Sequence, residues 1–153
     1  MQAWCEKHIL SQTPAFLFVP SVQVLETITA ILKKYHSSVE GVHSADEDRL
    51  SKVAAFRKGT CPLLVTTTIL ERGVTVPGAE AAVFGAEEDI FTESALVQIA
   101  GRVGRSKDQP DGDVVFFHVG KTNAMLAARR HILTMNKAPA NGEENTYVKS
   151  KHR

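Results

Sequence analysis

The stretch "LVQIAGRVGRS" (96–106) decides how this sequence is interpreted, because it sets Arg102 and Arg105 three residues apart with a glycine directly before each. The apolar run at its start predicts a short helix from Leu96 to Arg102. Arginine is always charged and its planar fork meets phosphate oxygens in two-point contact, whereas glycine lets a backbone approach a neighbouring domain closely. A pair of surface salt-bridge partners explains the bare motif equally well, so the surrounding sequence has to decide.

On both sides of this motif, short apolar runs rich in β-branched and aromatic residues alternate with longer amphipathic stretches. This alternation is typical of an α/β fold, in which helices cover both faces of a parallel sheet. The predicted strands are 15–19, 38–43, 62–67, 81–85 and 114–119. The predicted helices are 2–10, 21–35, 44–59, 96–102 and 121–136.

Several residues are expected to fix the ends and faces of these helices. Ser21 is the predicted N-cap of the second helix, Ser44 and Glu47 have the spacing of a capping box, and Gly59 is expected to end the third helix. The stripe of the second helix that should face the sheet consists of Val24, Leu25, Ile28, Ile31, Leu32 and Tyr35. The last helix should direct Met125, Leu126, Ile132, Leu133 and Met135 toward the sheet.

Length and composition bound the class of protein. A chain of 153 residues is the size of one domain, and a net charge of +1 gives no overall basic field, so any nucleic-acid contact has to be local. Cys5 and Cys61 have no metal-binding or disulfide-framework spacing, and no signal peptide or 18-residue apolar run is present, which favours a cytoplasmic protein without a metal site. We expect one domain over 1–136 and a mobile C-terminal tail over 137–153.

Small hydroxyl-bearing residues, glycines and one histidine follow the predicted strands, at the sheet edge where α/β proteins gather their ligands. They are Ser21, His43 with Ser44, Thr67 with Thr68, Gly85 and Gly120. Such positions suit phosphates, because backbone N–H groups and helix N-termini can approach an anion there. For any single residue a simple helix cap is the commoner explanation, and the set as a whole is more informative.

The sequence lacks the motifs that hold a nucleotide's phosphates and magnesium. "VGKT" (119–122) resembles the end of a Walker A loop, but Val115 stands where that loop needs a glycine. The acidic runs at 46–48 and 87–89 do not end an apolar strand, so we interpret them as solvated carboxylates rather than a Walker B pair. A chain that has the two arginines but lacks Walker A and Walker B motifs fits a module that supplies an arginine finger, an arginine that contacts the transferring phosphate, to a nucleotide site held by another domain.

Four segments together resemble the conserved motifs of superfamily 2 helicases. "QIAGRVGR" (98–105) resembles motif VI, "LLVTTTILERGVTVPG" (63–78) motif V, and "AFLFVPS" (15–21) motif IV, while "VHSADEDRLSKVAAFRKG" (42–59) resembles the segment between motifs IV and V. The resemblance covers about residues 14–118. It implies the second RecA-like domain of the helicase core, a three-layer sandwich with a mostly parallel sheet. Within the superfamily the chain is most similar to the bacterial competence helicases, with the PriA restart helicases as cousins.

The resemblance also assigns roles to residues. It implies that Arg102 and Arg105 are arginine fingers directed at the γ-phosphate of ATP. The residues it places on the nucleotide side are Gly73, Thr75, Gln98 and Gly101. The residues it places on the nucleic-acid side are Ser21, His43, Ser44, Thr67 and Thr68. Thr75 stands where DEAD-box RNA helicases carry an aspartate, which argues against an RNA helicase of that type.

The implied function is that of the C-terminal motor domain of an ATP-dependent single-stranded-DNA translocase or helicase that drives DNA uptake in competence. ATP and Mg²⁺ would be bound mainly by the first RecA-like domain of the same protein, and this chain by itself would be inactive. Single-stranded DNA, that first domain and a membrane DNA-transport machinery are the implied partners, at the cytoplasmic face of the membrane. The alternatives are a PriA-like restart helicase domain and a non-catalytic nucleic-acid or protein interaction module on the same fold.

Overall fold

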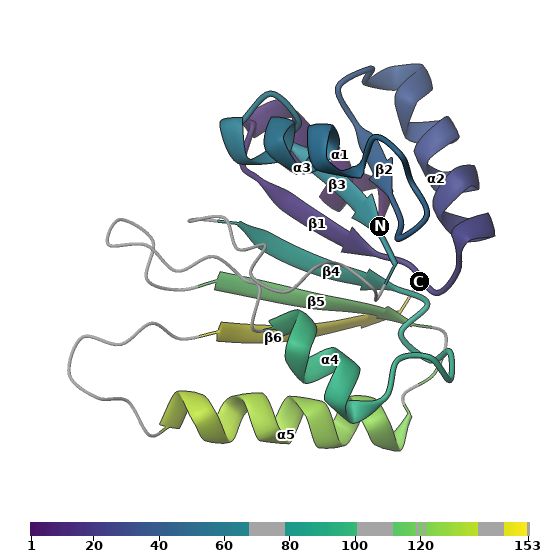
Figure 1. Ribbon diagram of the computed structural model, residues 1–153. Coiled ribbons are helices and arrows are strands. Elements are labelled where there is room, and N and C mark those ends of the chain that lie inside the picture. The colour runs from purple at the N-terminus through teal and green to yellow at the C-terminus, as the bar shows by residue number, and fades with distance from the viewer. Residues whose placement is uncertain (68–78, 101–111, 119, 121, 138–145, 153) are drawn as a thin grey trace.

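Six parallel strands form one sheet in the computed structural model, which describes residues 1–67, 79–100, 112–118, 120, 122–137 and 146–152 (Figure 1). The strands are β1 (Ala15–Phe18), β2 (Glu40–Val42), β3 (Leu63–Thr66), β4 (Glu80–Phe84), β5 (Gly112–His118) and β6 (Thr146–His152). The helices are α1 (Gln2–Ser11), α2 (Val22–Tyr35), α3 (Arg49–Lys58), α4 (Glu93–Ala100) and α5 (Asn123–Lys137). The order across the sheet is β2-β3-β1-β4-β5-β6, and every neighbouring pair is parallel.

The helices cover both faces of the sheet, which gives the predicted three-layer architecture. Side chains of α1 and α2 pack with one set of strand residues, whereas side chains of α3, α4 and α5 pack with the other. The two sets alternate along β1, because Phe16 and Phe18 face α3 to α5 while Ala15 and Leu17 face α1 and α2. All four of these residues are buried, as expected for a strand that has helices on both sides.

The five predicted strands are confirmed to within two residues at each end, and β6 is an additional strand. Residues 146–152 pair with β5 along its whole length, where the sequence analysis expected a tail without an element. The segment has no apolar run, but Thr146, Tyr147 and Val148 are residue types that favour an extended backbone. A free sheet edge at β5 supplies the partner that the local sequence could not reveal.

Ser21 and Gly59 have the capping roles predicted for them. The Ser21 hydroxyl accepts a hydrogen bond from the Val24 N–H at 3.2 Å, and Gly59 ends α3 with a φ of 85°. The predicted capping box at Ser44 and Glu47 is wrong, because α3 begins only at Arg49. The residues in between form a turn that is held by other contacts and is described below.

Three apolar side chains expected to face the sheet are exposed instead. Ile31 and Tyr35 on α2 are 50% and 68% exposed, and Leu126 on α5 is 41% exposed. On α2 the buried stripe is the narrower set Leu25, Ile28 and Leu32. No helix within the described residues is long and apolar enough to cross a membrane.

The chain changes direction across the sheet at β1. From β1 it proceeds to β2 and β3 on one side, and from β3 it crosses back to β4 on the other side. The direction in which successive strands are added to the sheet therefore reverses after β3, and β1 is the strand between the two halves. In sheets of this kind the crevice outside the carboxyl ends of the strands at such a switch point is where ligands bind.

Candidate functional site at the carboxyl edge of the sheet

The strand-tip residues singled out from the sequence do lie at one edge of the sheet, because β1, β2 and β3 are parallel neighbours. Ser21 follows β1, His43 and Ser44 follow β2, and Thr67 follows β3. Ser21 and Ser44 are exposed and His43 is half-buried, whereas Thr67 is only 7% exposed. The structure thus brings these four residues to one edge but gives Thr67 little accessible surface.

Two of these residues keep a hydrogen-bond donor available. The Ser21 hydroxyl accepts from the Val24 N–H, a bond that leaves its own proton uncommitted. The Nδ1 atom of His43 accepts from the Ala45 N–H at 3.2 Å, so neutral His43 carries its proton on Nε2. A serine O–H and an imidazole N–H are both suitable donors to a phosphate oxygen.

The turn between β2 and α3 is held by one lysine and one aspartate. Lys52 Nζ donates to Asp46 Oδ2 at 2.6 Å and to the Gly41 carbonyl oxygen at 2.9 Å. The other carboxylate oxygen of Asp46 accepts from the Asp48 N–H at 2.9 Å. The hydrogen bond from Lys52, reinforced by the Asp48 N–H, lowers the pKa of the Asp46 carboxyl below its ordinary value of 3.8. Asp46 is therefore not a solvated carboxylate, which corrects the interpretation of the run at 46–48.

A second acidic group lies on the other side of β1. Glu88 and Asp89, between β4 and α4, line a hollow of about 320 Å³ together with Ser21, Val24 and Ile90. Both carboxylates are exposed, as expected, whereas the carboxylate oxygens of Glu87 are buried, which corrects the interpretation of the run at 87–89 for that residue. Negative charge beside Ser21 opposes a phosphate there, so the β2 and β3 side of the edge is the better side for a polyanion.

Helix α4 leads toward the arginine motif and has one defined outward face. Leu96, Ile99 and Ala100 are buried against the sheet, which leaves Gln98 exposed. An exposed amide on a helix anchored in this way is accessible to a neighbouring domain. The remaining site residues expected from the sequence lie outside the described residues; they are Thr68, Gly73, Thr75, Gly101, Arg102 and Arg105.

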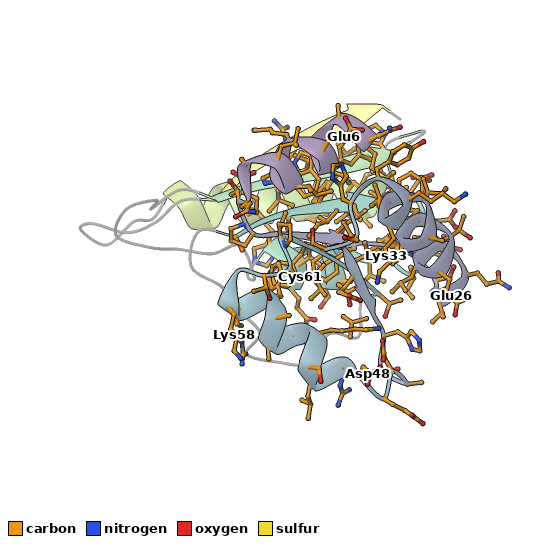
Figure 2. The ribbon with its side chains drawn as sticks, turned by 90° about the horizontal axis from the view of Figure 1, so that it is seen from above. Glu6, Glu26, Lys33, Asp48, Lys58 and Cys61 are labelled. Atoms are coloured by element: carbon orange, nitrogen blue, oxygen red, sulfur yellow. The ribbon has the colours of Figure 1, made fainter. Side chains whose placement is uncertain are left out.

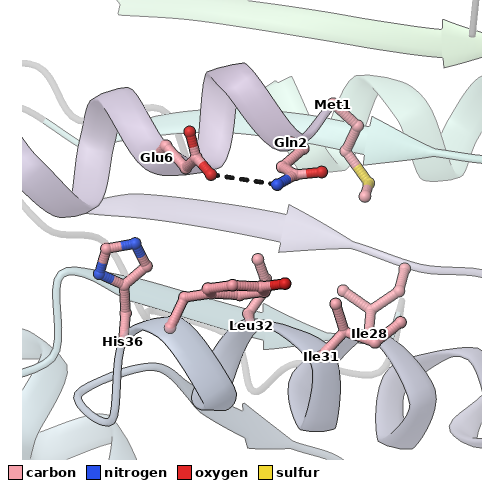
Figure 3. A pocket seen from close by; sticks show the side chains of 8 residues that line it. Met1, Gln2, Glu6, Ile28, Ile31, Leu32 and His36 are labelled. Carbon is pink, nitrogen blue, oxygen red and sulfur yellow. Dashed lines mark hydrogen bonds between the residues drawn. The ribbon is translucent and has the colours of Figure 1, made fainter.

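An apolar hollow between α1 and α2 is separate from this edge (Figure 3). Ile28, Ile31 and Leu32 of α2 face Met1 and Gln2 across it, and a hydrogen bond of 3.1 Å joins Gln2 to Glu6 on its α1 side. It is lined by the C-terminal half of α2, the end away from Ser21. Ile31 and Tyr35 line this hollow and are exposed, although the sequence predicted that they face the sheet.

Sequence reasoning missed Lys52 as a residue of the site. Its position in α3 carries no motif, and its two acceptors lie 6 and 11 residues away in the chain. Contacts of that kind depend on the path of the turn, which the sequence had placed inside a helix. No group of three or more histidine, cysteine, aspartate or glutamate side chains in the described part of the chain is arranged to hold a metal ion.

Comparison with known proteins identifies relatives of the whole chain. Residues 2–107 match the family of the helicase conserved C-terminal domain. The chain is 54% identical over 143 residues to the competence protein ComFA of Bacillus subtilis (strain 168), an alignment that covers 94% of this chain and 31% of that protein. It is 40% identical over 139 residues to the competence protein ComFA of Streptococcus pneumoniae (strain ATCC BAA-255 / R6), covering 90% of this chain and 32% of that protein.

A solved structure supports the fold. Domain 2 of the DEAD-box helicase Mss116p, in a structure with an RNA duplex, aligns with a TM-score of 0.62 at 22% identity, over 95% of this chain and 56% of that chain. At this identity the likeness concerns the fold alone. The chain spans about a third of the length of the two ComFA proteins, so their other two thirds have no counterpart in the sequence described here.

Proposed function

Because this chain belongs to the family of the helicase conserved C-terminal domain, we propose that it is the C-terminal motor domain of an ATP-dependent single-stranded-DNA translocase that drives DNA uptake in competence. The likeness to two competence proteins over at least 90% of the chain supports the biological setting. A first RecA-like domain would hold ATP and Mg²⁺, and the protein would act at the cytoplasmic face of the membrane beside a DNA-transport machinery.

The observation that carries the proposal is that the first of two groups of site residues gathers at the strand-tip edge. In this first group, donor-bearing residues follow β1, β2 and β3, which lie side by side in the sheet. The first group would contact the sugar-phosphate backbone of the strand. Arg102 and Arg105 would complete an ATP site in the first domain, and Gln98, Gly101, Gly73 and Thr75 would lie near the nucleotide.

The donors of the His43–Ser44 turn fit backbone contacts rather than base recognition. A hydroxyl and an imidazole N–H can each donate to a phosphate oxygen, and such contacts carry no sequence information. The net charge of +1 supplies no general attraction, so binding would depend on this local edge and on the first domain. We therefore expect weak, salt-sensitive binding with little sequence preference. Ser21, beside Glu88 and Asp89, would contribute less than the turn after β2.

A charge introduced at Ser44 tests this assignment. Ser44 is exposed, so Ser44→Asp should leave the fold intact while placing a negative charge next to the backbone phosphates. A like charge at about 4 Å in water costs about 1 kcal/mol, so the Kd for a fluorescein-labelled oligothymidylate should rise about fivefold.

The matched control is Ser38→Asp, an exposed serine before β2 at the opposite edge of the sheet. It changes the net charge equally and should leave the Kd close to that of the unmodified chain. Equal weakening by both variants would mean that the strand does not bind at the carboxyl edge.

A further inference from the structure

The turn that carries His43 and Ser44 is held by a side chain from the following helix. Three of its hydrogen bonds are local: the Asp46 N–H donates to the His43 carbonyl oxygen at 3.1 Å, the Ala45 N–H to His43 Nδ1 and the Asp48 N–H to Asp46 Oδ1. Asp46 takes part in two of these three hydrogen bonds, one through its backbone N–H and one through its carboxylate. The conformation of the turn therefore depends on where the Asp46 side chain is held.

Lys52 fixes that side chain to the sheet. From the first turn of α3 its ammonium group bridges Asp46 Oδ2 at 2.6 Å and the Gly41 carbonyl oxygen in β2 at 2.9 Å. The Lys52 and Asp46 side chains are 25% and 13% exposed, so solvent screens this pair less than a fully exposed one. Because Gly41 belongs to β2, the bridge ties the turn to a strand of the sheet.

We propose that Lys52 and Asp46 are positioning residues, which hold the turn after β2 in the conformation that presents His43 and Ser44 to the nucleic-acid backbone. This inference rests on the proposed function and deepens it, because it names residues that act on the strand through others. Neither residue needs to contact the strand itself. The lowered pKa of the Asp46 carboxyl agrees with a carboxylate that stays ionised opposite Lys52 at all ordinary pH values.

The direction in which one substitution changes the Kd distinguishes a positioning role from a direct electrostatic effect. Asp46→Asn removes a negative charge close to the proposed phosphate path, so electrostatics alone would tighten binding. Positioning predicts the opposite, because the amide N–H₂ would face the Lys52 ammonium and the bridge would be lost. We expect the Kd for a fluorescein-labelled oligothymidylate to rise about fivefold in Asp46→Asn, the equivalent of one net hydrogen bond.

Lys52→Met removes the ammonium group and keeps most of the apolar stem. It should weaken binding by a similar factor, and the double variant with Asp46→Asn should be no worse than either single one, since both remove the same bridge. The slope of log K against log salt should stay unchanged. A lysine that itself contacts a phosphate would instead lower that slope by about 0.7 when it is removed.

Lys33→Met is the matched control, because Lys33 also pairs with a residue of β2. Its ammonium lies 3.2 Å from Glu40 Oε1, and Figure 2 shows it on α2. Lys33 lines the same hollow as His43, Asp46 and Lys52, so the control removes a positive charge from the same surroundings. The charge change is the same as in Lys52→Met, but the turn after β2 keeps all of its contacts. We expect the Kd of this variant to stay close to that of the unmodified chain.

Amide hydrogen exchange reports on the turn without any nucleic acid. The Ala45, Asp46 and Asp48 amides should exchange about tenfold faster in Lys52→Met and Asp46→Asn than in the unmodified chain and in Lys33→Met. Unchanged exchange in both variants, or tighter binding by Asp46→Asn, overturns the positioning role even when the unmodified chain binds the oligonucleotide. An unmodified chain that binds no oligonucleotide overturns the proposed function instead, whatever the exchange rates show.

Discussion

At the scale of single residues, Arg102 separates a motor domain from a binding module. In a chimera that carries this chain in place of the matching segment of Bacillus subtilis ComFA, Arg102→Ala should reduce DNA-stimulated ATP turnover by about 10³ or more. DNA binding should survive, because Arg102 is proposed to act on the γ-phosphate and not on the DNA. Arg102→Lys should not restore turnover, since a point ammonium cannot reproduce the planar two-point contact.

The control for this prediction is Arg129→Ala, which removes an exposed arginine from α5. It should leave turnover nearly unchanged. Normal turnover in a folded Arg102→Ala chimera would mean that the arginines of "QIAGRVGR" are surface charges without a catalytic role. That result would favour the non-catalytic interaction module.

The two cysteines give a second prediction at this scale. Cys5 and Cys61 are buried, one in each of the two core clusters, and burial raises their thiol pKa from 9.0 to about 12 and about 11. The protonated thiols therefore contribute to stability fully below pH 9.0, and this contribution is lost as the pH rises through about 11 to 12. At neutral pH neither thiol should react with Ellman's reagent until guanidinium unfolds the chain. Rapid reaction of the native chain would contradict the burial of α1 or of the α3–β3 connection.

At the scale of elements, the contact between α2 and β2 depends on a glycine. A Cβ atom on Gly41 would lie 2.5 Å from Thr29 Oγ1 and 2.9 Å from Leu25 Cδ2, so these two side chains or α2 itself would have to shift. Gly41→Ala should lower the free energy of unfolding by about 1–3 kcal/mol, measured by urea denaturation. Gly120→Ala is the control, because no atom of the described residues lies within 4 Å of its added Cβ. Equal stability of the two variants would mean that α2 does not pack on β2 as described.

The elements that could be predicted from the sequence are those whose signal is local. Strands such as Leu63–Thr66 are apolar at consecutive positions, and Ser21 and Gly59 mark helix ends by their own chemistry. The start of α3 could not be predicted, because the capping-box spacing at Ser44 competes with the Lys52 bridge, which exists only in the folded chain. Ile31 and Tyr35 were misplaced for a similar reason, since their stripe is wider than the face that α2 buries.

In the candidate site, too, some features follow from the sequence and others depend on the folded chain. The alternation of strands and helices was enough to bring Ser21, His43, Ser44 and Thr67 to one edge, because parallel strands place their carboxyl ends together. The burial of Thr67 and the acidic neighbours of Ser21 depend on which strands are adjacent, and strand order cannot be obtained from spacing. The roles of Arg102 and Arg105 stay predictions from the motif.

At the scale of the whole molecule, the chain should be catalytically silent alone. It would hold the finger side of a shared ATP site, so the purified chain should bind ATP very weakly and show no DNA-stimulated phosphate release in a coupled assay. Turnover by the chain that disappears in Lys121→Ala would mean that "VGKT" is a working phosphate loop and that the domain assignment is wrong. Lys121→Ala is therefore also the control that separates intrinsic turnover from a contaminating ATPase.

The short edge strand β2 also has a consequence for behaviour at high protein concentration. An open sheet margin offers unpaired backbone groups to a strand from another copy, which is a route to aggregation. Here that margin is three residues long, and the Lys52 ammonium occupies the Gly41 carbonyl oxygen on it. The opposite margin, β6, is seven residues long and carries Lys149 and Lys151 in its sequence. The lysine that bridges Asp46 and Gly41 thus leaves one fewer backbone acceptor open to a strand from another copy at this margin.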